Sequence, residues 1–199
     1  MPLHVPPAPA PALRSVLAAL GSPTAVRESH TPALRSVQGP LSPELPLPVH
    51  VLNPIRPGEQ PTTRLTAWRF QLHAESRAVA AADAVLTADG WTFSHFFEGP
   101  YLASTELAVR QAESTAIAYQ PRLLSVPELY MLTLWLHGDP GADPTTGTVA
   151  SADILVPLAP APTGIAAHRP YRAADLLPVM SLRIAPVPRL NTARRDLVT

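Results

Sequence analysis

The side chains best suited to chemistry fall in two short segments, Ser94-His95-Phe96-Phe97-Glu98 and His137-Gly138-Asp139. If the strands that carry them were neighbours, two imidazoles and two carboxylates would offer nitrogen and oxygen ligands for zinc or a similar ion. Neither segment has the spacing of a known ligand set such as His-Glu-x-x-His. We therefore expect no metal ion and no cofactor.

Serine chemistry is the second use these residues allow. A histidine can act as a general base, and Ser94 or Ser104 would be the nucleophile that it activates. The chain has no Gly-x-Ser-x-Gly motif, however, and a histidine at a strand end is more often a half-buried hydrogen-bonding residue than a catalytic group. The pattern does not favour a hydrolase.

Aromatic side chains near the first segment suggest a ligand pocket. Pockets are mostly apolar with a few polar groups, and the residues that fit this description are Trp91, Phe93, His95, Glu98, His137 and Asp139. A plain hydrophobic core explains the same aromatics more simply. In a strand, Trp91 and Phe93 share one face while Phe96 begins the other, so at least one aromatic is expected to face a partner or a second copy.

Period-two alternation predicts the elements that must position these residues. Thr66, Trp68, Phe70 and Leu72 alternate with other residues as in a strand with one buried face, and Asp89-Gly90 is a strong hairpin signal. Further strands are expected at 118–125, 129–137 and 153–158, with helices from Ser104 to about Thr115 and from about Arg172 to Val179. This order predicts an α+β fold with a mostly antiparallel sheet and one or two packed helices.

The distribution of aromatics and prolines divides the chain. Every Phe, Trp and Tyr lies between Trp68 and Tyr171, whereas more than half of the 26 prolines lie before residue 62. A proline-dense segment without aromatics is unsuited to building a core. We expect a Pro-rich extended arm at 1–61, a globular domain at 62–185 and a loose tail at 186–199.

The arm contains one internal repeat, because Pro-Ala-Leu-Arg-Ser-Val occurs at both 11–16 and 32–37. In the first copy the apolar residues recur at i, i+3, i+4 and i+7, as on one face of a short helix, with Pro11 in its first turn and Gly21 after its end. A pair of docking helices on a tether is one interpretation, with partner-binding residues Leu13, Val16, Leu17, Leu20, Leu34 and Val37. Coincidence in a low-complexity segment, or a structural helix, is the other.

Composition excludes several classes of protein. The formal net charge is zero, so no positive field attracts nucleic acid, and the absence of cysteine removes disulfides and thiolate metal sites. The apolar stretch at 129–136 is far shorter than the roughly 20 residues that span a bilayer, and the N-terminus lacks the apolar run of a signal peptide. We expect a cytoplasmic protein.

These observations predict a non-enzymatic interaction or assembly protein, which binds a protein partner or forms a homo-oligomer. The alternative is a small enzyme or ligand-binding protein with its site around Trp91, His95, Glu98 and His137. Geometry discriminates between the two. Convergence of the histidines and carboxylates in one cleft favours the enzyme, and their separation favours the interaction protein.

Overall fold

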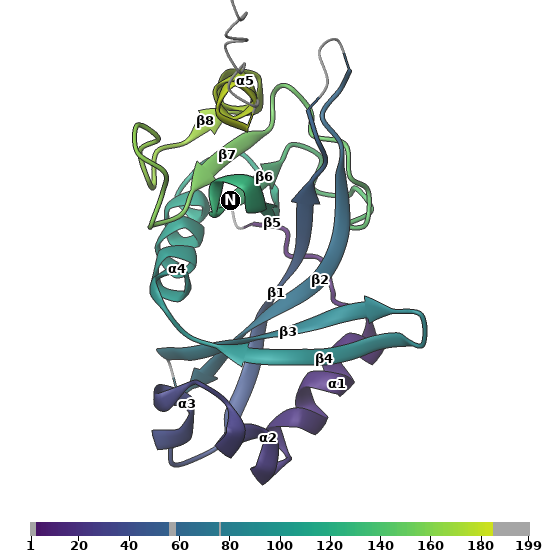
Figure 1. The fold of residues 1–199 in the computed structure, drawn as a ribbon, viewed down its shortest axis with the longest axis vertical. Coiled ribbons are helices and arrows are strands. Elements are labelled where there is room, and N and C mark those ends of the chain that lie inside the picture. The colour runs from purple at the N-terminus through teal and green to yellow at the C-terminus, as the bar shows by residue number, and fades with distance from the viewer. Residues whose placement is uncertain (1–2, 56–58, 76, 185–199) are drawn as a thin grey trace, which may run out of the picture.

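An eight-stranded sheet organises the residues that the computed structural model describes, which are 3–55, 59–75 and 77–184 (Figure 1). The strand order is β4-β3-β2-β1-β5-β6-β7-β8. Neighbouring strands are antiparallel except β1 and β5, which are parallel. The strands are β1 (Leu41–Leu52), β2 (Thr63–Ala74), β3 (Arg77–Thr87), β4 (Gly90–Phe97), β5 (Gln120–Val126), β6 (Met131–His137), β7 (Ile154–Pro157) and β8 (Tyr171–Arg172).

Five α-helices accompany the sheet in the described part of the chain. They are α1 (Ala10–Leu20), α2 (Pro23–Glu28), α3 (Pro32–Ser36), α4 (Pro100–Glu113) and α5 (Ala173–Ile184), and a 3-10 turn, η1 (Pro127–Leu129), links β5 to β6. The α+β class and the mostly antiparallel sheet are therefore confirmed. No helix in the described ranges combines the length and apolar character needed to cross a membrane.

The hairpin predicted at Asp89-Gly90 joins β3 to β4. Thr87 pairs with Gly90, whose φ of 108° is a conformation that glycine adopts without strain. The alanine-rich segment before this turn is a strand and not a helix. Its alanines at 80, 82 and 84 pack beneath the large side chains of β2, so tertiary contact outweighs the helix preference of alanine.

Both predicted helices are longer than their sequence patterns indicated. The first begins at Pro100 and not at Ser104. The fixed φ of proline suits the first helical turn, where a backbone N–H would have no intrahelical acceptor. Ser104 is consequently a buried residue inside α4 and not its cap. The second, α5, continues beyond Val179 to Ile184 despite the internal Pro178.

The N-terminal segment corrects the expected division at residue 61, since β1 lies inside the sheet between β2 and β5. Its apolar residues alternate with prolines, and Leu47 and Val49 are buried in the core. A register shift between Glu44 and Leu47, with Leu45 at a φ of 45°, locates the irregularity that accommodates the prolines. Residues 3–52 thus belong to the fold. The tail expected at 186–199 lies outside the described residues.

The two faces of the sheet carry different helices. Successive residues of β5 and β6 point to opposite faces, so Leu123 and Leu134 pack with α4, whereas Leu124 and Trp135 pack with α5. Figure 1 shows α1 and α3 beside the β3–β4 end of the sheet. There they cover a separate apolar cluster around Trp68, which the strand register places on the same face as α5. This arrangement leaves the stretch of sheet around β1 and β5 to be covered by the loop that connects β6 to β7.

Candidate functional site

The first predicted segment lies on β4, at an edge of the sheet. His95 is exposed, with its Nδ1 atom 3.0 Å from the Ser94 hydroxyl. Glu98 accepts hydrogen bonds of 3.2 and 3.3 Å from the backbone N–H of Ala33, so its carboxylate holds the first turn of α3. Trp91 and Phe93 pack partly against the core beneath α1. A depression of about 470 Å³ passes this segment, with His30 of the α2–α3 connection on its other side.

The second predicted segment lies far from the first. His137 ends β6, and four strands separate β6 from β4 in the sheet. The His137 Nδ1 atom lies 3.0 Å from an Asp153 carboxylate oxygen, while Asp139 is exposed and accepts a hydrogen bond from the N–H of Gly141. The predicted pocket is therefore corrected, since the strand order divides its members. Across the described ranges no cluster of three or more His, Asp and Glu residues is placed to hold a metal ion.

The candidate nucleophile Ser104 does contact a histidine, but not one that the sequence had indicated. Its hydroxyl lies 3.2 Å from His168 Nε2 and accepts a 2.7 Å hydrogen bond from the N–H of Ala159. The other imidazole nitrogen of His168 is buried and has no hydrogen-bond partner in the described part of the chain. A serine–histidine pair is activated when a third group orients the base, and these contacts provide no such group.

The predicted docking residues are divided between the core and the surface. Val16 and Leu34 are 0% and 2% exposed, and Leu13 and Leu20 pack partly against the same core cluster as these two. Val37 is half-buried, whereas Leu17 remains 46% exposed. Because α1 directs most of its apolar stripe onto β3 and β4, it does not present that stripe to a partner.

A buried polar cluster that sequence reasoning missed lies on the α5 face of β1, β5 and β6. Arg122 is 0% exposed, and its guanidinium donates to Gln120 Oε1 and to the backbone carbonyls of Thr146 and Asp143, at 2.6 to 3.1 Å. The guanidinium also stacks 4.8 Å from the ring of Trp135. A lone arginine within an apolar strand was the available signal.

His50 joins the cluster from β1. Its Nε2–H donates to the carbonyl of Pro144 at 2.9 Å, so the neutral ring accepts from the Thr63 hydroxyl through Nδ1 at 2.8 Å. Burial, with a smaller contribution from the positive charge of Arg122, lowers the pKa of His50 to about 4. Desolvation likewise lowers the Arg122 pKa to about 10, which still leaves that group charged near neutrality.

Asp153 supplies the negative charge of the cluster and is 1% exposed. Its carboxylate accepts hydrogen bonds from the Trp135 indole N–H, the His137 ring and the backbone N–H groups of Gly138 and Ala150, each at 2.8 to 3.0 Å. Both ends of the β6–β7 loop are thus bound to one side chain. The function that this chemistry supports is structural, because the cluster fixes a long loop that has no helix or strand of its own.

The fixed loop contacts the β1–β2 hairpin closely. Thr63 N–H donates to the carbonyl of Gly147, and Val149 N–H donates to that of Pro61. A Cβ atom at Gly147 would clash with the Thr63 carbonyl oxygen, so a side chain cannot be accommodated there without moving the backbone. This contact sets the position of Val149 and Ser151 beside α5.

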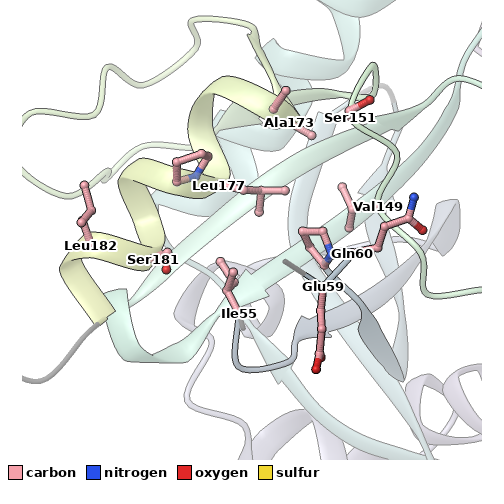
Figure 2. A pocket seen from close by; sticks show the side chains of 12 residues that line it. Ile55, Glu59, Gln60, Val149, Ser151, Ala173, Leu177, Ser181 and Leu182 are labelled. Atoms are coloured by element: carbon pink, nitrogen blue, oxygen red, sulfur yellow. The ribbon is translucent and has the colours of Figure 1, made fainter. Parts of the chain in front are cut away.

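An apolar groove of about 530 Å³ runs between α5 and this assembly (Figure 2). Figure 2 shows Leu177 and Ser181 of α5 on one side, with Ile55, Gln60 and Val149 opposite. Leu182, at the end of the groove, is 80% exposed. The polar residues that hold the β6–β7 loop are buried beneath the groove. The groove therefore combines an apolar lining with one wall that is fixed by hydrogen bonds.

Comparisons with known proteins identify no relative, since no family model, curated protein or solved structure matches this chain.

Proposed function

We propose that this chain is a non-enzymatic interaction and assembly protein, and that its contact surface is the groove along α5. The observation that carries the proposal is the exposure of Leu182, at 80%, beside an apolar groove. A single exposed leucine is ordinary, but one that adjoins a contiguous apolar depression is typical of a protein contact.

The outward face of α5 supports this function. Ala174, Pro178, Val179 and Leu182 are exposed on it, and the exposed charged residues of the helix, Asp175 and Arg183, lie in its first and last turns. A surface depleted of charge at its centre and bordered by polar groups has the composition of an interface core. Glu59, Gln60 and Ser151 provide the polar border.

The buried cluster supports it in a second way. His50, Arg122 and Asp153 fix the β6–β7 loop, and this loop carries Val149 and Ser151 of the groove wall. A preformed wall lowers the entropic cost of binding, because few side chains must be ordered on contact. The polar cluster then serves the interaction surface without touching the partner.

Site-specific photo-crosslinking tests this function. A photoreactive amino acid replaces Leu182 in the full chain, expressed in its own cells, and the matched control carries it at Leu86, which is 56% exposed in the β3–β4 hairpin. We expect discrete protein adducts, of this chain or of another protein, from position 182 and not from position 86. Equal adduct yields at the two positions, or none at position 182, would overturn the proposal.

A further inference from the structure

We propose that the partner which fills the α5 groove is a second copy of this chain, bound through antiparallel contact of the two α5 helices about a two-fold axis. The inference rests on the proposed function, because it names the occupant of the same groove. It follows from the shape of one helix, from its charges and from the net charge of the chain.

The shape of α5 is complementary to itself. Ala174, Pro178 and Leu182 are spaced four residues apart and therefore share one stripe of the helix, and all three line the groove. Along the stripe the side chains change from a small alanine, through a compact proline ring, to a large leucine. When two such helices meet antiparallel with Pro178 at the axis, each Leu182 lies opposite the Ala174 of the other copy, so each protruding side chain faces a hollow.

The charges of α5 select the same orientation. Asp175 lies in its first turn and Arg183 in its last. Antiparallel pairing brings the carboxylate of one copy to the end of the helix that bears the guanidinium of the other, whereas parallel pairing would bring like charges together. Arg183 is held at this end by a hydrogen bond to the carbonyl of Thr163.

The charge of the whole chain does not oppose self-association. The formal net charge is zero, with 15 basic and 15 acidic residues. Identical copies therefore approach without the long-range repulsion that keeps strongly charged proteins monomeric. A partner of strongly charged surface gains no comparable advantage from this groove.

Sedimentation velocity on the purified full chain, over a wide range of concentration, tests the inference. We expect a monomer–dimer equilibrium, and Leu182→Asp should weaken dimerisation by about tenfold or more, because it places a charge where an apolar side chain is buried in both copies. Leu86→Asp makes the same change on an exposed leucine far from α5 and should leave the equilibrium unchanged.

A size exchange makes the test specific to the proposed pairing. Ala174→Leu alone should weaken the dimer, because two large side chains then face each other, and adding Leu182→Ala should restore it, because large again faces small. Failure of the double variant to recover, with circular dichroism unchanged, would overturn the two-fold arrangement. A wild-type chain that stays monomeric at every concentration would overturn the second-copy inference. Crosslinking at position 182 to a different protein would then leave the proposed function standing, and no crosslinking would remove both.

Discussion

The segments that cover the α5 face of the sheet hold their places by different chemistry. Over β2, β3 and β4, α1 packs Ala12 and Val16 onto an apolar cluster, and α3 adds Leu34. Over β1, β5 and β6, the β6–β7 loop is held by hydrogen bonds to Arg122 and Asp153. Apolar packing is graded and can relax, whereas a buried polar cluster is stable only while each of its groups keeps a partner.

The same contrast separates the part of the surface that packs on the sheet from the part that is left open for a partner. The apolar stripe of α1 is occupied by the sheet, so the helix that the sequence marked as a docking element is mainly structural. The loop held by polar groups is the one that forms a wall of the open groove. The proposed interaction surface is therefore the one whose support depends on single residues and on pH.

Asp153→Ala should have the largest effect. It leaves four buried or partly buried donors without their acceptor and removes the negative charge that offsets Arg122. We expect the free energy of unfolding to fall by about 3–5 kcal/mol, as measured by urea denaturation near neutral pH. Asp153→Asn retains an acceptor and should cost less. A loss below about 1 kcal/mol for the alanine variant would show that the cluster does not hold the loop.

Acidification should have the next largest effect. Because burial lowers the pKa of His50 from 6.5 to about 4, the unfolded chain binds a proton more readily than the folded one between these values. The contribution of His50 to the free energy of unfolding is fully present above pH 6.5. It declines as the pH falls towards 4 and changes no further below that. The decline totals roughly 3 kcal/mol at 1.36 kcal/mol per unit.

Denaturation profiles of wild type and His50→Gln measure this contribution. Glutamine offers a donor and an acceptor but does not titrate in this range, so the variant should lack the part of the acid sensitivity that His50 causes. Profiles that run parallel from pH 6.5 to 4 would contradict the assignment.

A matched pair of leucine substitutions should have smaller and unequal effects. Leu34→Ala creates a cavity beneath α3, where the side chain is 2% exposed, and should cost about 2–3 kcal/mol. Leu17→Ala, at 46% exposure on α1, should change the free energy of unfolding by less than about 0.5 kcal/mol. Thermal or chemical denaturation distinguishes them. Equal costs would mean that α1 and α3 do not pack as the structure shows.

The sequence indicated the elements whose patterns are local. Alternation at Trp68, Phe70 and Leu72, the Asp89-Gly90 turn and the stripe of α1 each predict their structure from neighbouring residues. β1 was missed because its prolines suggested an extended arm, although Leu45, Leu47, Val49 and Val51 alternate as in a strand. Proline outweighed alternation in that prediction, whereas a register shift accommodates it in the fold.

The candidate site could not be predicted in the same way, because its parts meet only through strand pairing. Arg122 on β5 lies opposite Trp135 on β6, and Asp153 precedes β7, which pairs with β6. The spacing of these residues along the sequence does not reveal which strands pair. Conversely, the distance between His95 and His137 depended on strand order, which placed four strands between them.

Hydrogen exchange of the purified chain at low and high concentration tests most directly the claim that α5, and not α1, is the contact surface. We expect amides of Ala173–Ile184 and of Val149 and Ser151 in the groove wall to gain protection as concentration rises, while those of Ala10–Leu20 do not change. A gain over Ala10–Leu20, or association without a gain over Ala173–Ile184, would contradict it.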